Sequence, residues 1–218
     1  VSDLLNTFPG MPLHPDPSSS TGPKMSIVLP VHNTPGVWLS DAVESLRNQS
    51  YSNWELIVVN DGSRLMETRA ALDKLNHPQI SIFSLETSVG ISAATCHGIY
   101  AATGDFVAFM DHDDMLTPNA LEKVTEEIGK SAPDILYTDE CLFDDTAAFK
   151  ENAGFDEAHF KPDYSPDLLL SHNYITHLLV VRKTLLDSVG GPRTEFDGAQ
   201  DYDFLLRNLP KDILPAYD

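Results

Sequence analysis

Cysteine and basic residues are both scarce in this sequence, and each scarcity narrows what the protein can be. Cys96 and Cys141 are the only cysteines, and neither has CxxC spacing or a neighbouring array of His and Cys, so a disulfide framework and a zinc ribbon are disfavoured and a reducing compartment is favoured. Only 14 Lys and Arg stand against 33 Asp and Glu, which gives a formal net charge of −19. This balance argues against nucleic acid as the main partner and against docking by a polybasic patch on an anionic membrane.

Long apolar runs and glycine-rich phosphate loops are also missing. Among the longest apolar runs is Leu56–Val59, far below the roughly 18 residues that span a bilayer, so we expect no transmembrane segment in this chain. Neither GxGxxG after the first predicted strand nor GxxxxGKS/T occurs, so a bound nucleotide diphosphate would need a metal ion to meet its charge. Because the sequence opens on Val1 rather than Met, we expect it to belong to a longer polypeptide with further domains.

Apolar runs alternate with helical patterns from Met25 onward. Residues 1–24 hold 5 of the 15 prolines, which predicts an extended lead-in or linker before a domain over residues 25–218. Short, near-continuous apolar runs predict buried strands at Met25–Val31, Leu56–Val59, Ile80–Leu85, Phe106–Met110, Ile135–Tyr137 and Leu178–Val181.

Apolar stripes at helical spacing predict helices between these strands. They cover residues 39–46, 91–102, 116–128 and 201–208, with Thr117 as the cap and Pro118 in the first turn of the third helix. The alternation predicts an α/β fold with a mostly parallel central sheet and helices on both faces. The C-terminal segment is expected to be more irregular, with residues 141–163 as loop or hairpin.

Polar residues follow three of the predicted strands, at the edge where open α/β sheets bind ligands. They lie at Pro30–Asn33, Asn60–Ser63 and Asp111–Asp114. Asp and Asn also follow strands as turn and cap residues, an alternative of equal weight for Asn60–Ser63. Three carboxylates within Asp111–Asp114 repel one another unless a cation binds, and such oxygen ligands suit Mg²⁺ or Mn²⁺. An EF-hand is excluded, because Met115 and Leu116 stand where its loop needs a ligand and a Gly.

Several ordered segments resemble glycosyltransferase family 2, whose members have the Rossmann-like GT-A fold. They are Ser26–Asn33 (SIVLPVHN), Gln49–Ser63 (QSYSNWELIVVNDGS), Gly90–Gly98 (GISAATCHG) and Gly104–Pro118 (GDFVAFMDHDDMLTP). The resemblance extends over residues 25–208, with 25–115 as the nucleotide-binding half and 116–218 as the acceptor-side half. Phe160–Leu170 (FKPDYSPDLLL) and Gly198–Arg207 (GAQDYDFLLR) are similar to the bacterial branch that builds O-antigens, cell-wall and capsular glycans.

The resemblance implies a donor site at the ends of these strands. In it, Asp61 contacts the nucleobase, Asp111 contacts the ribose as the first carboxylate of the DxD motif, and Asp113 binds Mn²⁺ or Mg²⁺. The donor-binding residues implied in this way are Pro30, Val31, Asn33, Asp61, Gly90, Ile91, Ala94, Asp111 and His112, with Pro30 and Val31 lining the base through their backbone and His112 shaping the turn.

Asp201, preceded by Gln200, matches the catalytic base of the family. Such a base takes the proton of the acceptor hydroxyl while its oxygen attacks the anomeric carbon from the face opposite the pyrophosphate. The alternative is a carboxylate that only stabilises the helix N-terminus. Asp203, two residues on, is expected to be a surface or capping residue.

The donor-sugar and acceptor side of the resemblance is weaker. It implies roles for Asp139, Glu140, His172 and Gln200. Relatives often carry a Lys two residues after the Glu that matches Glu140, and this Lys is absent here. Many also carry a His after the Gln-Asp helix that completes the metal or diphosphate site, and this sequence does not offer one. His172, Asn173 and His177 lie on the acceptor-side stretch by resemblance, and a structural role is the favoured alternative for each, while Lys161 is expected to be a lone exposed Lys.

These features together predict an inverting, metal-dependent glycosyltransferase of bacterial surface polysaccharide synthesis. The expected donor is a UDP- or dTDP-sugar, and the acceptor is a glycan or a lipid-linked glycan at the cytoplasmic face of the membrane. Two alternatives stay open: a sugar nucleotidyltransferase, and a non-catalytic nucleotide- or glycan-binding domain of a larger protein. The first would want a Gly-rich basic loop after the first strand, and Val31–Gly36 offers none.

Overall fold

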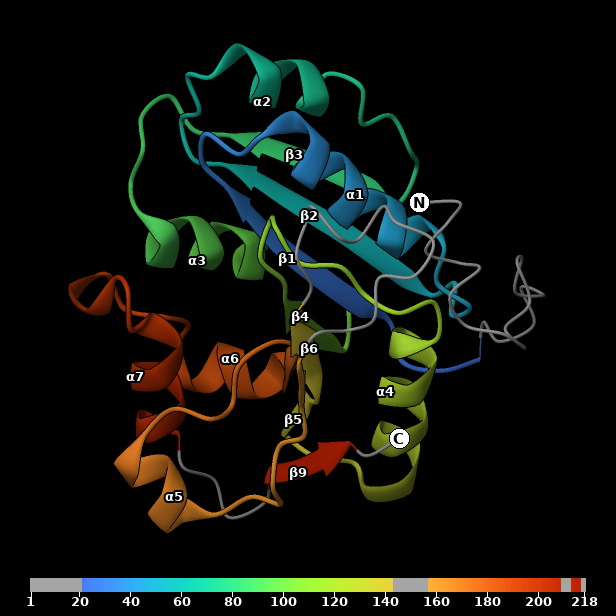
Figure 1. The fold of residues 1–218 in the computed structure, drawn as a ribbon, viewed down its shortest axis with the longest axis vertical. Coiled ribbons are helices and arrows are strands. Elements are labelled where there is room, and N and C mark those ends of the chain that lie inside the picture. The colour runs from blue at the N-terminus through green and yellow to red at the C-terminus, as the bar shows by residue number, and fades with distance from the viewer. Residues whose placement is uncertain (1–20, 143–156, 209–212, 217–218) are drawn as a thin grey trace.

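A seven-stranded sheet forms the centre of the molecule in the computed structural model, which describes residues 21–142, 157–208 and 213–216 (Figure 1). The strand order is β3-β2-β1-β4-β8-β5-β9. Every neighbouring pair is parallel except those of β8, which runs antiparallel to β4 and β5. The strands are β1 (Met25–Val31), β2 (Trp54–Asn60), β3 (Ile80–Ser84), β4 (Phe106–Phe109), β5 (Ile135–Thr138), β8 (Leu179–Arg182) and β9 (Ile213–Ala216). The predicted α/β fold with a mostly parallel sheet is confirmed.

The central strands are buried on both faces, which explains their continuous apolar sequences. Every residue of β1 except Pro30 is buried, and β2 is buried except at Glu55. Strands covered on both sides carry such Val- and Ile-rich runs, without polar alternation. Because β1 pairs in parallel with both β2 and β4, the carboxyl ends of all three strands lie at the same edge of the sheet. The polar segments that follow them meet there.

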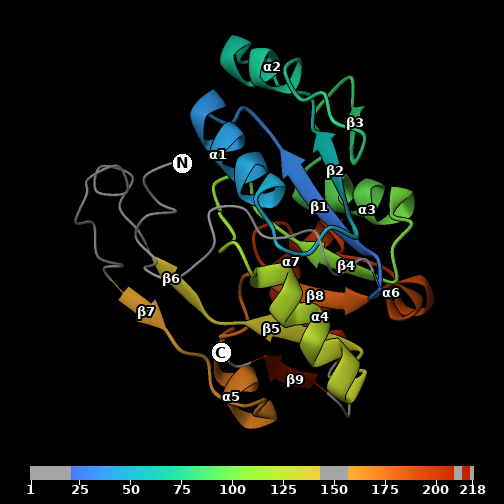
Figure 2. The ribbon, with the colours of Figure 1, turned by 90° about the vertical axis from the view of Figure 1, so that its right-hand side faces the viewer.

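Helices cover both faces of the sheet, as predicted (Figure 2). On one face, α1 (Gly36–Arg47), α2 (Met66–Leu72) and α4 (Ala120–Ser131) form a core with alternate residues of β1 and β2. On the other face, α3 (Ile91–Ala101), α5 (Pro166–Ser171), α6 (Lys183–Val189) and α7 (Gln200–Arg207) form a second core, which contains Val28 and Ile57. A short 3₁₀ helix, η2 (Thr194–Phe196), precedes α7.

The antiparallel strand β8 determines which segments meet at the edge of the sheet. Phe109 at the end of β4 pairs with Leu179 at the start of β8. The residues that follow β4 therefore lie beside the residues that precede β8. This places Asp111 next to the segment that contains His177, an arrangement that parallel pairing would not produce.

Two details of the predicted elements need correction or addition. The third predicted helix begins at Ala120 with Asn119 as its N-cap, so the prediction that Thr117 caps it is wrong. The backbone carbonyls of Thr117 and Pro118 instead accept hydrogen bonds from Gln49 and Ser50, at 2.7 and 2.8 Å, which holds this segment outside the helix. The helices α2, α5 and α6 were not predicted.

The segment predicted as loop or hairpin contains two short paired strands. β6 (Glu140–Leu142) pairs antiparallel with β7 (Glu157–His159), and the residues between them lie outside the described ones, as does most of the predicted lead-in. In the described part of the chain, no helix has the length and apolar character needed to cross a bilayer.

Candidate active site

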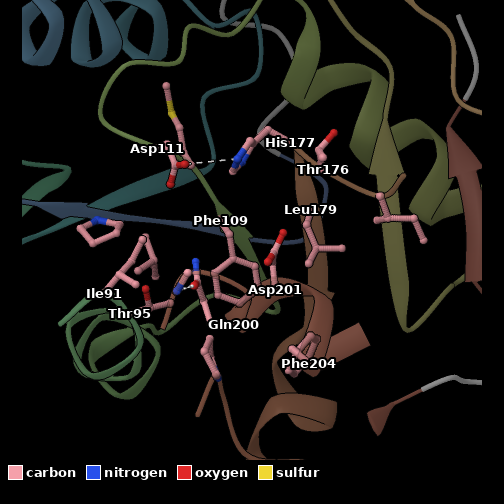
Figure 3. A pocket seen from close by; sticks show the side chains of 16 residues that line it. Ile91, Thr95, Phe109, Asp111, Thr176, His177, Leu179, Gln200, Asp201 and Phe204 are labelled. Atoms are coloured by element: carbon pink, nitrogen blue, oxygen red, sulfur yellow. Dashed lines mark hydrogen bonds and ion pairs between the residues drawn. The ribbon is translucent and has the colours of Figure 1, made fainter. Parts of the chain in front are cut away.

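A cavity of about 220 Å³ opens at the carboxyl ends of β1 and β4, between α3 and α7 (Figure 3). Five predicted site residues line it: Pro30, Ile91, Asp111, Gln200 and Asp201. These come from four separate parts of the sequence, so the fold brings together residues that were predicted for the donor side and for the acceptor side. None of the described residues that line the cavity is Lys or Arg. An anionic ligand would therefore meet carboxylates and a His rather than a fixed cation.

Asp111 and His177 line one end of the cavity and form an acidic cluster with Asp114. His177 Nε2 lies 3.2 Å from Asp111 Oδ2, and His177 Nδ1 lies 3.6 Å from Asp114 Oδ2. Burial alone would lower the pKa of His177, but its hydrogen bond to Asp111 and the surrounding carboxylates raise this pKa to about 9. In the absence of a metal ion, His177 is therefore protonated at neutral pH and bridges the two carboxylates.

The two carboxylates respond to this cluster in opposite ways. Burial raises the pKa of Asp111, but the hydrogen bond and the charge of His177 outweigh it, so the pKa lies below its usual value. Burial also raises the pKa of Asp114, and repulsion from Asp111 and Asp113 adds to it, so this pKa lies above its usual value despite the attraction of His177. The like charges predicted from the sequence are thus present, and an imidazolium compensates them in part.

The same three side chains fit a divalent cation. Each offers one ligand atom, and these atoms lie within 4.8 Å of one another. Asp114 Oδ2 and His177 Nδ1 are buried and lack a hydrogen-bond partner among the described residues, and they form only an ion pair with each other at 3.6 Å, so a cation would give both atoms a direct partner. Two carboxylates and one imidazole suit Mn²⁺ and, with water ligands, Mg²⁺.

Asp113, the predicted metal ligand, is not a member of this group. Its side chain is 54% exposed and lies 3.7 Å from Nδ1 of His112, at the turn between Asp111 and Asp114. The role of Asp113 as a ligand stays a prediction. His177 was expected to be structural, and the signal that would have identified it is its position before an antiparallel strand, which follows from strand pairing and not from any local motif.

Asp201 lies in the first turn of α7 and lines the opposite end of the cavity. Figure 3 shows its carboxylate next to Phe109 and Leu179, on the side of the cavity away from Asp111 and His177. Asp201 Oδ2 accepts a hydrogen bond of 2.8 Å from Asn173 Nδ2. Gln200 also lines the cavity, and its side chain accepts a hydrogen bond from the backbone N–H of Gly198.

On the donor side, Asp61 organises the loop before α3. Its side chain is 4% exposed and accepts hydrogen bonds from the backbone N–H groups of Val89 and Gly90 and from the hydroxyl of Ser88, at 2.7 to 3.1 Å. Both carboxylate oxygens are thus engaged within the protein. The contact between Asp61 and the base stays a prediction, and the structure adds a role in fixing the loop that carries Gly90.

Three other predicted donor residues, Val31, Asn33 and Ala94, lie outside the cavity lining and contribute to the fold around it. Asn33 Oδ1 accepts hydrogen bonds from the backbone N–H groups of Arg64 and Leu65, which ties the ends of β1 and β2 together. The side chains of Val31 and Ala94 are fully buried, so a donor would meet only their backbone. Neither Asn33 nor these two residues lines the cavity.

A buried Lys connects the acceptor side to the acidic cluster, and the prediction that Lys161 is exposed is wrong. Lys161 is 7% exposed, and its Nζ donates to the backbone oxygens of Thr138 and His177, both at 2.7 Å, and to Glu140 Oε2 at 3.3 Å. Asp139 Oδ1 accepts a hydrogen bond from the backbone N–H of Lys161. Burial lowers the pKa of Lys161, although the nearby carboxylates oppose this.

Two other expectations on this side have clear outcomes. Asp203 is 8% exposed and pairs with Arg193 and Arg207, so it is a buried ion-pair residue and not the predicted surface or capping residue. His172 is exposed at the end of α5, stacks edge-on with Tyr174 at 6.2 Å, and does not line the cavity.

Comparison with known proteins agrees with this architecture. The family profile described as Glycosyl transferase family 2 matches residues 26–186. The chain is 41% identical over 198 residues to the uncharacterized protein y4gI of Sinorhizobium fredii, and 37% identical over 191 residues to the O-antigen biosynthesis protein RfbC of Myxococcus xanthus. It is 28% identical over 194 residues to the putative colanic acid biosynthesis glycosyl transferase WcaA of Escherichia coli.

The share of each chain that these matches cover differs widely. The three matches cover 87%, 86% and 85% of this chain but only 21%, 14% and 66% of the respective relatives. The crystal structure of S. aureus TarS 1-349 superimposes with a TM-score of 0.71 at 22% identity, over 89% of this chain and 58% of that chain. At this identity the superposition establishes the fold, which is GT-A.

Proposed function

The chain belongs to glycosyl transferase family 2, and from this premise we propose that it is an inverting, metal-dependent glycosyltransferase domain of bacterial surface polysaccharide synthesis. The observation that carries the proposal is that Asp201 lines the same cavity as Asp111 and His177. A candidate base and a candidate cation site thus face one space, from opposite sides (Figure 3). The proposed donor is a UDP- or dTDP-sugar, and the proposed acceptor is a glycan or a lipid-linked glycan at the cytoplasmic face of the membrane.

The names and titles of related proteins support this choice of substrates. RfbC is named for O-antigen biosynthesis and WcaA for colanic acid biosynthesis. TarS crystal structures are titled as complexes with UDP and with UDP-GlcNAc. UDP and UDP-GlcNAc are therefore the first ligands to test on this chain.

Asp201 is the base of the proposed reaction. Its Oδ2 accepts the hydrogen bond from Asn173, and its Oδ1 has no partner among the described residues, so Oδ1 is free to take the proton of an acceptor hydroxyl. The hydroxyl oxygen forms its bond to the anomeric carbon as the bond to the diphosphate oxygen breaks on the opposite face. Attack from that face inverts the configuration of the carbon.

The leaving diphosphate needs more positive charge than the cavity lining provides, because His177 is the only group among the described lining residues that can carry one. No Lys or Arg lines the cavity among the described residues, and Lys161 nearby is already bonded to Thr138, Glu140 and His177. Asp111, Asp114 and His177 would hold a Mn²⁺ or Mg²⁺ ion, whereas Asp113, the ligand that the family resemblance implies, lies outside this group. When bound, such an ion offsets the negative charge that builds on the leaving group.

The test begins with calorimetric binding of UDP, dTDP and GDP, each with and without Mn²⁺, to the wild-type chain and to Asp111→Ala. We expect UDP or dTDP to bind only with Mn²⁺ and the variant to lose this binding. Binding that does not depend on Mn²⁺ would contradict the metal requirement. Release of UDP from UDP-GlcNAc, with water in place of the acceptor, then tests the catalytic role of Asp201. Nucleotide binding without turnover on any acceptor would favour the non-catalytic alternative.

A further inference from the structure

The only side-chain partner of Asp201 among the described residues is Asn173. Asn173 lies between α5 and β8, far from α7 in the sequence, and its Nδ2 donates to Asp201 Oδ2 at 2.8 Å. A carboxylate accepts hydrogen bonds and cannot donate them, so the amide nitrogen, and not the amide oxygen, must face Asp201. In this orientation Oδ1 of Asn173 is buried and has no hydrogen-bond partner in the described part of the chain.

A buried carbonyl oxygen without a partner costs stability, so this arrangement calls for an explanation. An Asn that served only to join α7 to the preceding segment could be exchanged for an apolar residue that packs there without the unsatisfied oxygen. The hydrogen bond to Asp201 is what such an exchange would remove. The residue with the unsatisfied oxygen is thus the same residue that donates a hydrogen bond to Asp201, the carboxylate that the proposed reaction uses as its base.

The segment that carries Asn173 is fixed by the two residues that follow it. The phenol oxygen of Tyr174 accepts a hydrogen bond of 2.9 Å from the backbone N–H of Ser165, and its ring stacks edge-on with Tyr137 at 6.1 Å. Ile175 is 1% exposed within the second core. Asn173 therefore approaches Asp201 from a packed support rather than from a loop that could move away.

Other groups near the start of α7 do not hold Asp201. Gln200 accepts from the backbone of Gly198, and Arg193 and Arg207 both pair with Asp203. The charged and titratable groups that share the cavity with Asp201 are Asp111 and His177, and they interact with each other. Without Asn173, no described side chain would fix the orientation of this carboxylate.

We infer that Asn173 is the positioning residue of the catalytic base: it holds Oδ2 of Asp201 so that Oδ1 faces the acceptor hydroxyl. This inference rests on the proposed function, because it assigns a task to Asn173 only if Asp201 takes the proton. Asn173 itself does not touch the reacting atoms. Its removal should therefore lower the rate of the chemical step and leave binding of the donor unchanged.

The kinetic test uses Asn173→Ala, with Asn208→Ala as the matched control. Asn208 donates its side-chain amide to the backbone oxygen of Phe204, at the other end of the same helix. With UDP-GlcNAc and Mn²⁺, we expect Asn173→Ala to lower kcat for UDP release by about tenfold to a hundredfold, part of the 10²–10⁴ that a general base contributes. The KM for UDP-GlcNAc and the Kd of UDP should stay within about twofold, and Asn208→Ala should resemble wild type. A wild-type kcat in Asn173→Ala would overturn the inference.

A double variant separates this inference from the proposed function. If Asp201→Asn abolishes turnover and Asn173→Ala adds no further loss in that background, the two residues act as one unit. Turnover that persists in Asp201→Asn would instead remove the base from the proposed function. Loss in Asp201→Asn together with full activity in Asn173→Ala would remove only the role of Asn173.

A spectroscopic measurement tests the contact without any turnover. The ¹H–¹⁵N side-chain amide signal of Asn173 can be assigned by its absence in Asn173→Ala. In wild type, one of its protons should be shifted downfield by the charged acceptor, and Asp201→Ala should return it toward the position of exposed Asn amides. A signal that does not move in Asp201→Ala would overturn the inference even if the protein were inactive on every donor.

Discussion

His177 Nε2 lies 3.2 Å from Asp111 Oδ2, although Asp111 follows β4 and His177 precedes β8, far along the sequence. The contact exists because Phe109 of β4 pairs with Leu179 of the antiparallel β8. Asp111 lies two residues after Phe109 and His177 lies two residues before Leu179, so both reach the acidic cluster at the same end of this strand pair. Backbone hydrogen bonds of the sheet thus determine the geometry of the candidate cation site. Side chains held by a sheet in this way are more precisely placed than side chains on free loops.

The first prediction concerns which residues hold the cation. We expect Asp114→Ala and His177→Ala to weaken Mn²⁺ binding by about tenfold to a hundredfold, because each removes one of three convergent ligand atoms. Asp113→Ala should change it by less than about threefold, since its side chain lies outside the group. The electron paramagnetic resonance signal of free Mn²⁺ measures all three. The opposite order of effects would support the Asp113 ligand that the family resemblance implies.

The second prediction is a pH dependence of stability in the metal-free protein. The folded-state pKa of His177 is raised from 6.5 to about 9, so its stabilising contribution is fully present below about pH 6.5 and is lost as the pH rises through 9. A shift of this size would correspond to about 3 kcal/mol at about 1.4 kcal/mol per unit. Because 42% of the His177 side chain is exposed, solvent screening reduces the expected effect to about 1 kcal/mol.

Urea unfolding in the presence of a chelator, at pH 6.5 and pH 9, measures this effect. The free energy of unfolding of wild type should fall between the two values by about 1 kcal/mol more than that of His177→Gln, which cannot take the proton. Equal slopes for the two proteins would show that the imidazolium does not contribute to stability in this cluster.

The sequence was most informative about elements that depend on local patterns. The strands β1 to β5 were predicted within about two residues, because strands buried on both faces carry continuous apolar runs that are visible without knowledge of their neighbours. Asp111, Gln200 and Asp201 were identified from motifs and do line the cavity. The order of the strands was not predictable in the same way, since it is set by contacts between segments that are far apart in the chain.

The errors in the sequence analysis have the same origin. His177 was set aside because its neighbours in the sequence carry no metal-binding spacing, yet the antiparallel strand places it against Asp111. Lys161 is buried because its partners Thr138, Glu140 and His177 come from other segments, and the sequence around this lone Lys does not show them. Both residues depend on how the acceptor-side half packs against the end of the sheet.

The third prediction concerns Lys161, which connects β5, β6 and the backbone of His177. Lys161→Met should destabilise the protein by about 2 kcal/mol, because the backbone oxygens of Thr138 and His177 lose this donor and Glu140 loses its ion pair while keeping the hydrogen bond from Thr176. It should also weaken Mn²⁺ binding, since the backbone oxygen of His177 loses its anchor. Urea unfolding and Mn²⁺ titration measure the two effects.

The matched control for Lys161→Met is Lys183→Met. Lys183 forms its ion pair with Asp187 one turn further along α6, and the two side chains are 19% and 57% exposed. Ion pairs with a solvent-exposed partner contribute roughly 0–1 kcal/mol, so Lys183→Met should change stability less than Lys161→Met and leave Mn²⁺ binding as in wild type. Equal effects of the two substitutions would contradict a special role for Lys161.

The last prediction concerns the loop that Asp61 holds at the start of α3. Gly90 has φ +92°, and a Cβ at this position would lie 2.2 Å from Asp197 Oδ2. Asp197 Oδ1 in turn accepts a hydrogen bond from the backbone N–H of Ser92 in the first turn of α3. Gly90→Ala should therefore both strain the backbone and displace Asp197, with an expected cost of about 2–4 kcal/mol in the free energy of unfolding.

Gly190→Ala separates these two causes. Gly190 also has a positive φ, +79°, but open space surrounds its Cβ position, so Ala there should cost only the backbone strain, about 1–2 kcal/mol. Urea unfolding gives both values, and UDP calorimetry with Mn²⁺ should show weaker binding for Gly90→Ala than for Gly190→Ala, because Gly90 directly precedes the lining residue Ile91, whereas Gly190 lies two residues before the lining residue Pro192. If the two variants lose equal stability and both bind UDP as wild type does, then the close approach of Asp197 to Gly90 has no bearing on the donor side of the site.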